Sequence, residues 1–359
     1  MKSRRVLTLV HKGLIPPDNP APEHIPTAAW KMEWDVISTL RAQGHDLHAI
    51  AVDDDLTPIR RAIDEFRPTI VFNLMEAFAD VGVFDQNVVS YLELLRVPYT
   101  GCNPRGLTLS RDKALAKKLM AYHRIPVPDF TVVARDRRPI LPKKLRFPLI
   151  VKSLLYESST GISQASVVAN EEQLHKRVQF IHESVGTAAI VEQFVEGREL
   201  YVGVIGNARL QVLPVWEMSF AQMPEHTWRI ATERVKWSVQ YQKRHGIDTA
   251  EAVLPDGLAP RIQHVAKRVY RALDLTGYAR IDLRMDAEGK LFVIEANPNP
   301  QLAQGEDFAE SANRAGVPYG NLLDRIMALG LQWNPWRTAW SPEDADKARL
   351  KAETVQRRK

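Results

Sequence analysis

Short apolar runs alternate with segments of helical periodicity over the first hundred residues. Three apolar runs have the length of one buried strand each: 6–10, 47–52 and 69–74. The spacing of apolar positions after them predicts helices: 29–43, 58–66 and 86–95. Strands that alternate with helices are typical of an open, parallel α/β sheet. Ligands approach such sheets at the carboxyl ends of the strands, so the proline-rich loop 16–22 is expected to border a site.

The pattern changes near residue 105. A helix is predicted over 110–122, and Asn170 caps a second one whose Leu174, Val178 and Ile181 recur at helical spacing. Further helices are expected at 259–273 and 319–330. The remaining apolar runs predict strands: 130–134, 148–153, 163–169, 188–194, 200–205 and a continuation to 216. This succession predicts a small α+β unit that leads into a larger one.

A β-hairpin over 278–297 carries the most informative side chains. If Asp286 pairs with Gly289 at the turn, Asp282 lies opposite Val293 and Arg280 lies opposite Glu295. Strand alternation then places four polar side chains on one face: Arg280, Asp282, Glu295 and Asn297. Four apolar side chains are expected to face the core: Ile281, Leu283, Phe292 and Ile294.

Two carboxylates and an amide oxygen on that face are ligands that Mg²⁺ accepts, together with phosphate oxygens and water. The alternative is a surface hairpin with an ordinary charged face. The apolar run around Glu295 favours the metal site, because a carboxylate buried there is costly without a partner.

Two lysines suggest contacts to phosphate. Lys152 ends a predicted strand and is followed by a Ser/Thr/Gly-rich turn, 153–161, whereas Lys113 begins a helix, where anions are favoured. Glu192 and Glu199 flank a connection between two strands, and carboxylates there can accept ribose hydroxyls. Each of these residues alone is more often a solvated or paired charge, and only their combination with the hairpin favours a nucleotide site.

Composition excludes several classes of protein. The 359 residues are 45% hydrophobic and 25% charged, as in ordinary globular proteins, and no run approaches the roughly 20 apolar residues that cross a bilayer. The single cysteine, Cys102, cannot form an internal disulfide, and the amino end lacks a signal-peptide core, so a cytoplasmic location is expected. No histidine or serine motif predicts a zinc site or a hydrolase.

The net charge of +5 is concentrated in the last residues. The tail 331–359 holds seven Lys/Arg against four Asp/Glu, which gives +3 of the +5. A nucleic-acid-binding protein should carry its basic face on the folded part, so we do not expect a nucleic-acid partner. Trp333, Trp336 and Trp340 are expected to dock on the protein's own surface or on a partner.

The ordered set of motifs resembles the ATP-grasp ligases, and most closely the D-alanine–D-alanine ligase branch. The motifs are Lys113, Val151-Lys152 with its Ser/Gly loop, Glu192 to Glu199, and Arg280-Ile-Asp282 with Glu295-Ala-Asn297. The resemblance covers residues 6–330 and includes Val97-Pro-Tyr-Thr-Gly101. It implies a mixed α/β and α+β fold of three domains: an N-terminal open α/β domain (1–105), a central lid (106–195) and a C-terminal ATP-binding domain (196–330). The basic, Trp-bearing tail 331–359 follows.

The resemblance also implies roles for individual residues. Lys113, Lys152 and Ser159 would hold the phosphates of ATP, and Glu192 and Glu199 would lie at its ribose and base. The segment formed by Gln193, Phe194 and Val195 would face adenine. Asp282, Glu295 and Asn297 would bind two Mg²⁺ ions, with Mn²⁺ as a substitute. Three residues would assist catalysis: Arg280 at the oxyanion, Ser158 at the first substrate, and Lys236 in a loop that closes over the site beside Trp237.

The chain departs from that branch at the substrate pockets. Residues 16–27 lack the branch's glutamate-bearing serine motif, and Phe72-Asn-Leu-Met-Glu76 replaces its His-Gly motif. Glu306-Asp307 stands where a Ser-Leu pair holds the second carboxylate, and an acidic pair would repel a carboxylate and attract an amine.

The sequence therefore predicts an ATP- and Mg²⁺-dependent carboxylate–amine ligase that works through an acyl phosphate and has altered pockets for small, amino-acid-like substrates. Three alternatives stay open: a true D-alanine–D-alanine ligase of peptidoglycan precursor synthesis, a carboxylase that uses carboxyphosphate, and a non-catalytic ATP-binding protein. The resemblance also implies a homodimer formed through the N-terminal domain.

Overall fold

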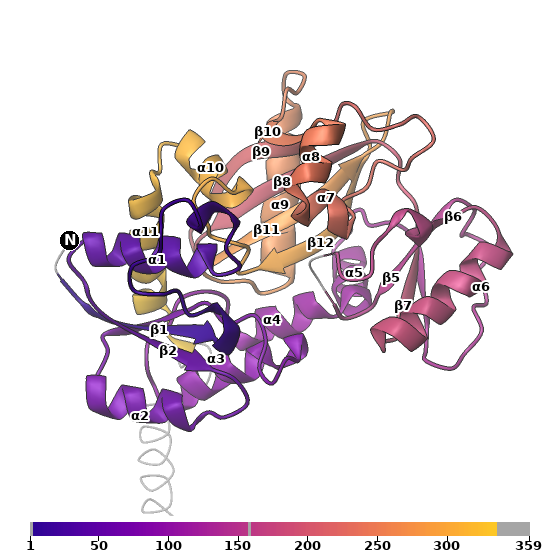
Figure 1. Cartoon of the computed structure of the whole chain (residues 1–359). Coiled ribbons are helices and arrows are strands. Elements are labelled where there is room, and N and C mark those ends of the chain that lie inside the picture. Colours follow the sequence, from indigo (N-terminus) through magenta and orange to yellow (C-terminus); the bar gives the residue numbers. More distant parts are fainter. Residues whose placement is uncertain (1–2, 157–158, 336–359) are drawn as a thin grey trace, which may run out of the picture.

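The structure, a computed structural model, describes residues 3–156 and 159–335. Three separate β-sheets follow one another along the chain, each with its own helices (Figure 1). Ser158, Trp336 and Trp340, for which the sequence suggested roles, lie outside the described residues, as does the tail from 336 onward. The domain boundaries expected near 105, 195 and 330 stay predictions.

The first sheet is parallel, as the alternation of strands and helices predicted. Its order is β2-β1-β3, formed by β1 (Arg5–His11), β2 (Asp46–Val52) and β3 (Ile70–Asn73). Three helices accompany these strands: α1 (Lys31–Ala42), α2 (Thr57–Phe66) and α3 (Asp85–Leu94). Short 3₁₀ turns lie at 12–14, 25–27 and 82–84.

Two helices connect the first sheet to the second, where the sequence predicted one. α4 (Pro104–Arg111) ends at Asp112, whose extended backbone interrupts the helix. The Asp112 carboxylate accepts hydrogen bonds from the amides of Ala114 and Leu115 and thereby caps α5 (Lys113–Tyr122).

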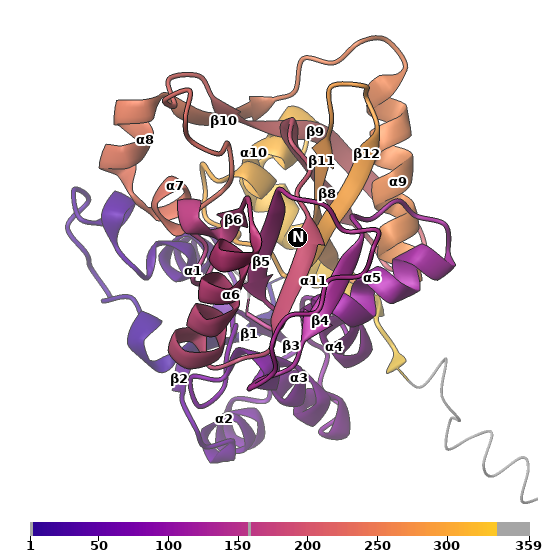
Figure 2. The same cartoon turned by 90° about the vertical axis from the view of Figure 1, so that its right-hand side faces the viewer.

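The second sheet, which we call the lid sheet, is antiparallel with the order β4-β7-β5-β6. Its strands are β4 (Phe130–Val133), β5 (Leu149–Ser153), β6 (Val167–Val168) and β7 (Ala189–Gln193). The strand predicted at 163–169 is shorter, because 164–166 form a 3₁₀ turn. Asn170 caps α6 (Glu171–Phe180), and a π-helical turn (181–185) follows it. Figure 2 looks onto the lid sheet with α6 over its outer face.

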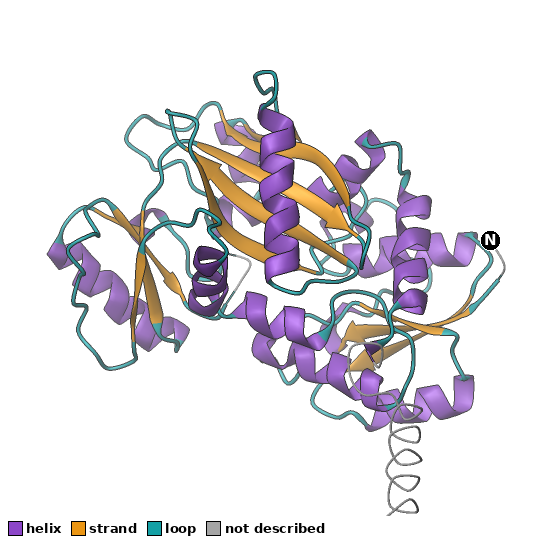
Figure 3. Cartoon of the chain, turned by 180° about the vertical axis from the view of Figure 1, so that it is seen from behind, coloured by secondary structure: helices purple, strands orange, loops and turns teal. Residues whose placement is uncertain are grey.

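The third sheet is antiparallel, with the order β10-β9-β8-β11-β12. Its strands are β8 (Arg198–Ile205), β9 (Gln211–Phe220), β10 (Ile247–Glu251), β11 (Tyr278–Met285) and β12 (Leu291–Pro298). Its helices are α7 (Glu233–Trp237), α8 (Val239–His245), α9 (Leu258–Ala272) and α10 (Asp307–Arg314), whereas α11 (Tyr319–Gln332) packs against α10 and against α1 and β3. Figure 3 shows α9 lying across one face of this sheet.

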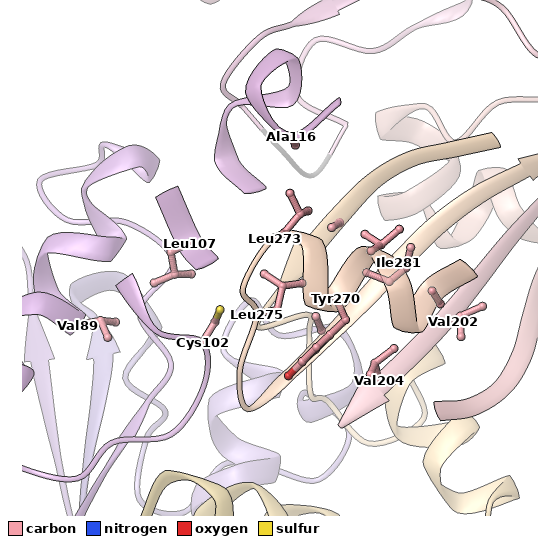
Figure 4. Packing of buried hydrophobic residues seen from close by; sticks show 14 of the residues in the cluster. Val89, Cys102, Leu107, Ala116, Val202, Val204, Tyr270, Leu273, Leu275 and Ile281 are labelled. Atoms are coloured by element: carbon pink, nitrogen blue, oxygen red, sulfur yellow. The ribbon is translucent and has the colours of Figure 1, made fainter. Parts of the chain in front are cut away.

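The first and third sheets share two hydrophobic clusters, whereas the lid sheet has a cluster of its own. Figure 4 shows Leu107 of α4 and Cys102 between Val89 of α3 and Leu275, which follows α9. The core of the lid sheet is formed among its own strands and α6, with Val151 and Leu174 at its centre. A lid with a separate core can move relative to the rest of the protein without breaking the main core.

Candidate active site

The hairpin of β11 and β12 is paired differently from the predicted register. Asp282 lies opposite Glu295, whereas Leu283 lies opposite Val293, so Ile294 is left unpaired in a β-bulge. The predicted pairing of Asp282 with Val293 and of Arg280 with Glu295 is therefore wrong, because it assumed regular alternation through the whole hairpin.

The bulge reverses the alternation of side chains along β12. Leu291 and Val293 are buried in the core before the bulge, and Ala296 is buried after it. Phe292 and Ile294 are only half-buried, so the prediction that they face the core is wrong. Four polar side chains nevertheless share one face, since residues directly opposite each other project to the same side: Arg280, Asp282, Glu295 and Asn297. We call this the polar face.

Asp282 is the centre of the polar face. Its two carboxylate oxygens accept hydrogen bonds from Arg280, with Nε–Oδ1 at 2.7 Å and Nη2–Oδ2 at 2.9 Å. Asn297 Nδ2 also donates to Asp282 Oδ2, at 2.9 Å, which directs the amide oxygen of Asn297 away from Asp282. A forked arginine–carboxylate pair holds both side chains in one orientation.

The two carboxylates of the polar face titrate differently. Burial raises the pKa of Asp282, although Arg280 acts against this. Burial also opposes ionisation of Glu295, but the positive charges of Lys113, Lys236 and Lys152 outweigh it and lower the pKa of Glu295 to about 2. Three ammonium groups around one carboxylate leave net positive charge where an anion could bind.

The lysines predicted to bind phosphate lie near Glu295, on the cavity that the polar face borders. Lys113 Nζ lies 3.9 Å from Glu295 Oε2 and donates to the carbonyl of Tyr156 at 2.6 Å. Lys152 Nζ donates to Glu192 Oε2 at 3.1 Å, and both side chains are buried. Lys236, from α7, lies on the same cavity.

A buried lysine that the sequence analysis missed completes this charge cluster. Lys117 on α5 is 0% exposed, and its Nζ lies 2.7 Å from the carbonyl oxygen of Ile294 and 3.5 Å from Glu192 Oε1. Burial lowers the pKa of Lys117 to about 8, despite Glu192. Burial opposes ionisation of Glu192 too, yet Lys117 and Lys152 together hold its pKa below the ordinary value. Both pKa values are lowered, which disfavours the charged form of Lys117 but favours that of Glu192, because Glu192 faces several ammonium groups.

The segment between β7 and β8 contributes an apolar wall to the cavity, formed by Phe194 and its neighbours. Phe194 is buried against Ile150, Val167 and Ile230, and its ring meets that of Trp228 edge-on at 5.2 Å. The backbone amides of Gln193 and Phe194 already donate to Asp129 and Pro148, so the expected adenine contact would have to use other groups of this segment. A flat apolar wall of this kind suits a nucleobase.

Glu199, expected at the ribose, already has protein partners. Tyr201 Oη donates to Glu199 Oε1 at 2.9 Å, and Arg284 Nη1 lies 3.9 Å from Oε2. Arg284 itself donates to the carbonyls of Gly197 and Arg229 and lies over the Phe194 ring. The sequence analysis missed Arg284, although it follows Asp282 at the spacing of one strand face.

Two loops meet over the cavity. We call residues 154–163, described at 154–156 and 159–163, the lid loop, and residues 221–246, which include Lys236, the cover segment. Ser159 Oγ of the lid loop donates a hydrogen bond to the carbonyl of Ala231 in the cover segment at 2.7 Å. Gln164, at the end of the lid loop, forms two more hydrogen bonds to Trp228. Arg177 of α6 donates to the carbonyl of Gly161 and anchors the lid loop from behind.

Most predicted site residues line a single cavity between the lid sheet and the third sheet: Lys113, Lys152, Ser159, Glu192, Gln193, Phe194, Val195, Glu199, Lys236, Asp282 and Glu295. Arg280 and Asn297 join it through their bonds to Asp282. The lysines predicted to bind phosphate and the apolar ring of Phe194 line the same cavity, a combination that suits a nucleotide.

The donor set of the polar face fits a hard divalent cation. Within the described residues no group of three His, Cys, Asp or Glu side chains is preassembled to hold a metal ion. Mg²⁺ does not need one, because it is commonly bound by one or two carboxylates together with substrate phosphates and water. Asp282, Glu295 and the amide oxygen of Asn297 are such a set. Among the helices described, none has the length and apolar content to cross a membrane.

Most of the chain is similar to known proteins in sequence and in fold. Residues 119–328 match the family model described as D-ala D-ala ligase C-terminus. The uncharacterized protein y4sG of Sinorhizobium fredii is 30% identical over 300 residues, which cover 81% of this chain and 85% of that protein. A D-alanine–D-alanine ligase of Desulfotalea psychrophila is 33% identical over 251 residues, or 69% of this chain and 74% of the ligase. The crystal structure of a D-alanine–D-alanine ligase from Bacillus anthracis complexed with ATP has the same fold, with a TM-score of 0.71 at 20% identity over 92% of this chain and 98% of that one.

Proposed function

The chain belongs to the D-alanine–D-alanine ligase family, and on that premise we propose that it is an ATP- and Mg²⁺-dependent carboxylate–amine ligase whose substrate pair differs from two D-alanines. The observation that carries the proposal is the single cavity that three lysines, four carboxylates and an apolar wall line together. The fold agrees with that of D-alanine–D-alanine ligases, which are ATP-grasp enzymes that form carbon–nitrogen bonds.

The reaction follows from the weakness of a carboxylate as an electrophile. A carboxylate oxygen of the first substrate attacks the γ-phosphorus of ATP, and the bond to the bridging oxygen breaks, which releases ADP and leaves an acyl phosphate. The amine nitrogen of the second substrate attacks the acyl carbon. The carbon–oxygen bond to phosphate then breaks, the nitrogen loses a proton, and an amide and inorganic phosphate remain.

The chain's own residues would lower these barriers through charge. Lys113 and Lys152 would neutralise the transferring phosphoryl group, and Arg280 would stabilise the oxyanion at the acyl carbon. Mg²⁺, held by Asp282, Glu295 and Asn297, would add positive charge at the phosphate oxygens; one or two ions are compatible with these ligands. Ser159 and Lys236 would close the lid loop and the cover segment and exclude water from the acyl phosphate.

The acceptor side supports a substrate other than D-alanine. Glu306 directly precedes α10; burial and the charge of Asp307 raise the pKa of Glu306, while Lys31 and Arg280 act against this. Asp307 accepts a hydrogen bond from Thr249 Oγ1, so it is held in place by β10. Negative charge beside Arg280 disfavours a second carboxylate there and favours an acceptor with an additional amine.

The decisive experiment measures phosphate release from Mg²⁺-ATP with amino acids, amines and small carboxylic acids, each alone and in pairs, and identifies amide products by mass. The Glu295→Gln variant is the matched inactive control. Release that requires a particular pair and yields its amide would support the proposal and name the substrates. Release with D-alanine alone would favour the true D-alanine–D-alanine ligase, and ATP binding without any release across the panel would favour a non-catalytic protein.

The homodimer stays a prediction. Light scattering of the full chain would test it, and a monomeric mass would contradict it.

A further inference from the structure

A fully buried lysine joins three parts of the protein that are distant in sequence. Lys117 extends from α5, which Figure 1 places between the lid sheet and β12. Its ammonium donates to the carbonyl of Ile294 at 2.7 Å and lies 3.5 Å from Glu192 of β7. Burying an ammonium group costs free energy, so a lysine with no exposed surface requires hydrogen-bond or charged partners that offset this cost.

The partner on β12 is the bulge residue itself. Ile294 is the residue that the pairing of β11 with β12 skips, and β12 is the edge strand of its sheet. Lys117 thus hydrogen-bonds the carbonyl of the one irregular residue in the hairpin. A hydrogen bond to a charged donor is stronger than one between neutral groups, so this contact stabilises the bulge specifically.

The bulge decides which way Glu295 points. Leu291 and Val293 are buried in the core, and regular alternation would send Glu295 into the core after them. Because of the extra residue, Glu295 lies opposite Asp282 on the polar face instead. A bulge is a recurrent way of redirecting a side chain into a site.

Glu192 explains why a lysine can be kept there in its charged form. Glu192 also accepts from Lys152, which would turn to the phosphates when a nucleotide binds. Lys117 then stays beside Glu192 and keeps that buried carboxylate paired.

We propose that Lys117 is a positioning residue that, by holding the carbonyl of Ile294, fixes the bulge that turns Glu295 toward the Mg²⁺ of the bound nucleotide. The inference rests on the proposed function, because it assumes that a metal–nucleotide complex binds at the polar face. Lys117 would touch neither the metal nor the substrates. Loss of the Lys117 ammonium should therefore weaken the binding of Mg²⁺ more than the binding of the nucleotide.

The experiment measures ADP binding to the full-length chain by titration calorimetry, first in EDTA and then at increasing Mg²⁺. Mg²⁺ is expected to change the affinity for ADP. We expect Lys117→Met to raise the Mg²⁺ concentration that gives half of this change by roughly 10- to 100-fold, as for other residues that orient a metal ligand. The affinity for ADP in EDTA should change less than the Mg²⁺ requirement, because Lys117 reaches the nucleotide site only through Glu192. Lys118→Met is the matched control, because Lys118 is the next residue of α5 and is exposed.

An unchanged Mg²⁺ requirement in a folded Lys117→Met variant would overturn the inference and leave the proposed function standing. No Mg²⁺ effect in the unmodified chain would overturn the metal site of the proposed function and this inference with it. If Lys117→Met does not fold, it is combined with Glu192→Gln, which neutralises the carboxylate that would otherwise lose its Lys117 partner, and the double variant is compared with Glu192→Gln alone. Equal Mg²⁺ requirements in those two proteins would equally overturn the inference.

Discussion

Gln164 holds the backbone of Trp228 at both of its polar groups. Gln164 Nε2 donates to the carbonyl oxygen of Trp228 at 3.0 Å, and the amide nitrogen of Trp228 donates to Gln164 Oε1 at 2.7 Å. The two residues lie 64 positions apart, one at the end of the lid loop and the other in the cover segment. Ile162 and Ile230, each two residues from one of them, line the cavity, so the pairing joins the two segments beside it.

Replacing Gln164 should therefore open the cavity. Gln164→Ala removes two hydrogen bonds that form only when the two loops meet, and each such bond is worth about 1 kcal/mol. We expect the dissociation constant for Mg²⁺-ADP to rise roughly 5- to 30-fold in titration calorimetry. Gln179→Ala, on the outer helix α6, should bind as the unmodified chain does. Equal affinity in Gln164→Ala would mean that the loops do not close on the nucleotide.

The carboxylates of the polar face should be indispensable for turnover. Asp282→Asn and Glu295→Gln keep the size of each side chain but remove the charge that a cation requires. We expect phosphate release to fall by at least about 10³-fold, as when a group that stabilises transition-state charge is removed. Circular dichroism should show an intact fold. Glu288→Gln, an exposed carboxylate at the turn of the same hairpin, should leave the rate unchanged. Near-normal turnover in either site variant would show that the metal lies elsewhere.

Lys152 should contribute to nucleotide affinity. A charge-assisted hydrogen bond to phosphate is worth about 1.5–3 kcal/mol, so Lys152→Ala should weaken ADP binding roughly 10- to 100-fold. The fold should survive, because Glu192 keeps its contact with Lys117. Lys143→Ala, an exposed residue before the same strand, is the control for general charge effects. If Lys152→Ala binds ADP with unchanged affinity, the lysine is only a partner of Glu192.

Glu33 should make the stability of the protein depend on pH. The side chain is 1% exposed, and burial raises the pKa of Glu33 from its ordinary value of 4.5 to about 7, with a smaller contribution from Glu76. The folded protein therefore holds this proton more tightly than the unfolded chain. Protonated Glu33 therefore contributes to the free energy of unfolding, and this contribution is fully present below pH 4.5. It is lost as the pH rises to 7, by about 3 kcal/mol in total.

Glu33→Gln should remove that dependence. Relative to the unmodified chain, the variant should gain about 3 kcal/mol in the free energy of unfolding between pH 4.5 and pH 8, measured by urea denaturation at both values. Glu65→Gln, on the exposed face of α2, should show no such gain. A constant difference between Glu33→Gln and the unmodified chain at the two pH values would contradict the assignment.

Local patterns were sufficient for most strands and helices, though not for α4, α7, α8, β10 and α10, and for the residue types of the site. Hydrophobic periodicity predicted the parallel first sheet, the capping of α6 by Asn170 and the helices α9 and α11, because each depends on residues close together in the chain. Alternation correctly grouped Arg280 with Asp282 on β11 and Glu295 with Asn297 on β12, because residues two apart along a regular stretch of strand share a face.

Contacts between distant segments decided the rest. The bulge at Ile294, which changed the register, is held by a lysine 177 positions away, and no local pattern distinguishes Lys117 from its exposed neighbour Lys118. Likewise, Glu192 carries the same charge in the sequence whether it faces solvent or two ammonium groups. Burial and pairing are properties of the packed chain, since only the tertiary structure excludes water from these groups and brings their partners within hydrogen-bonding distance.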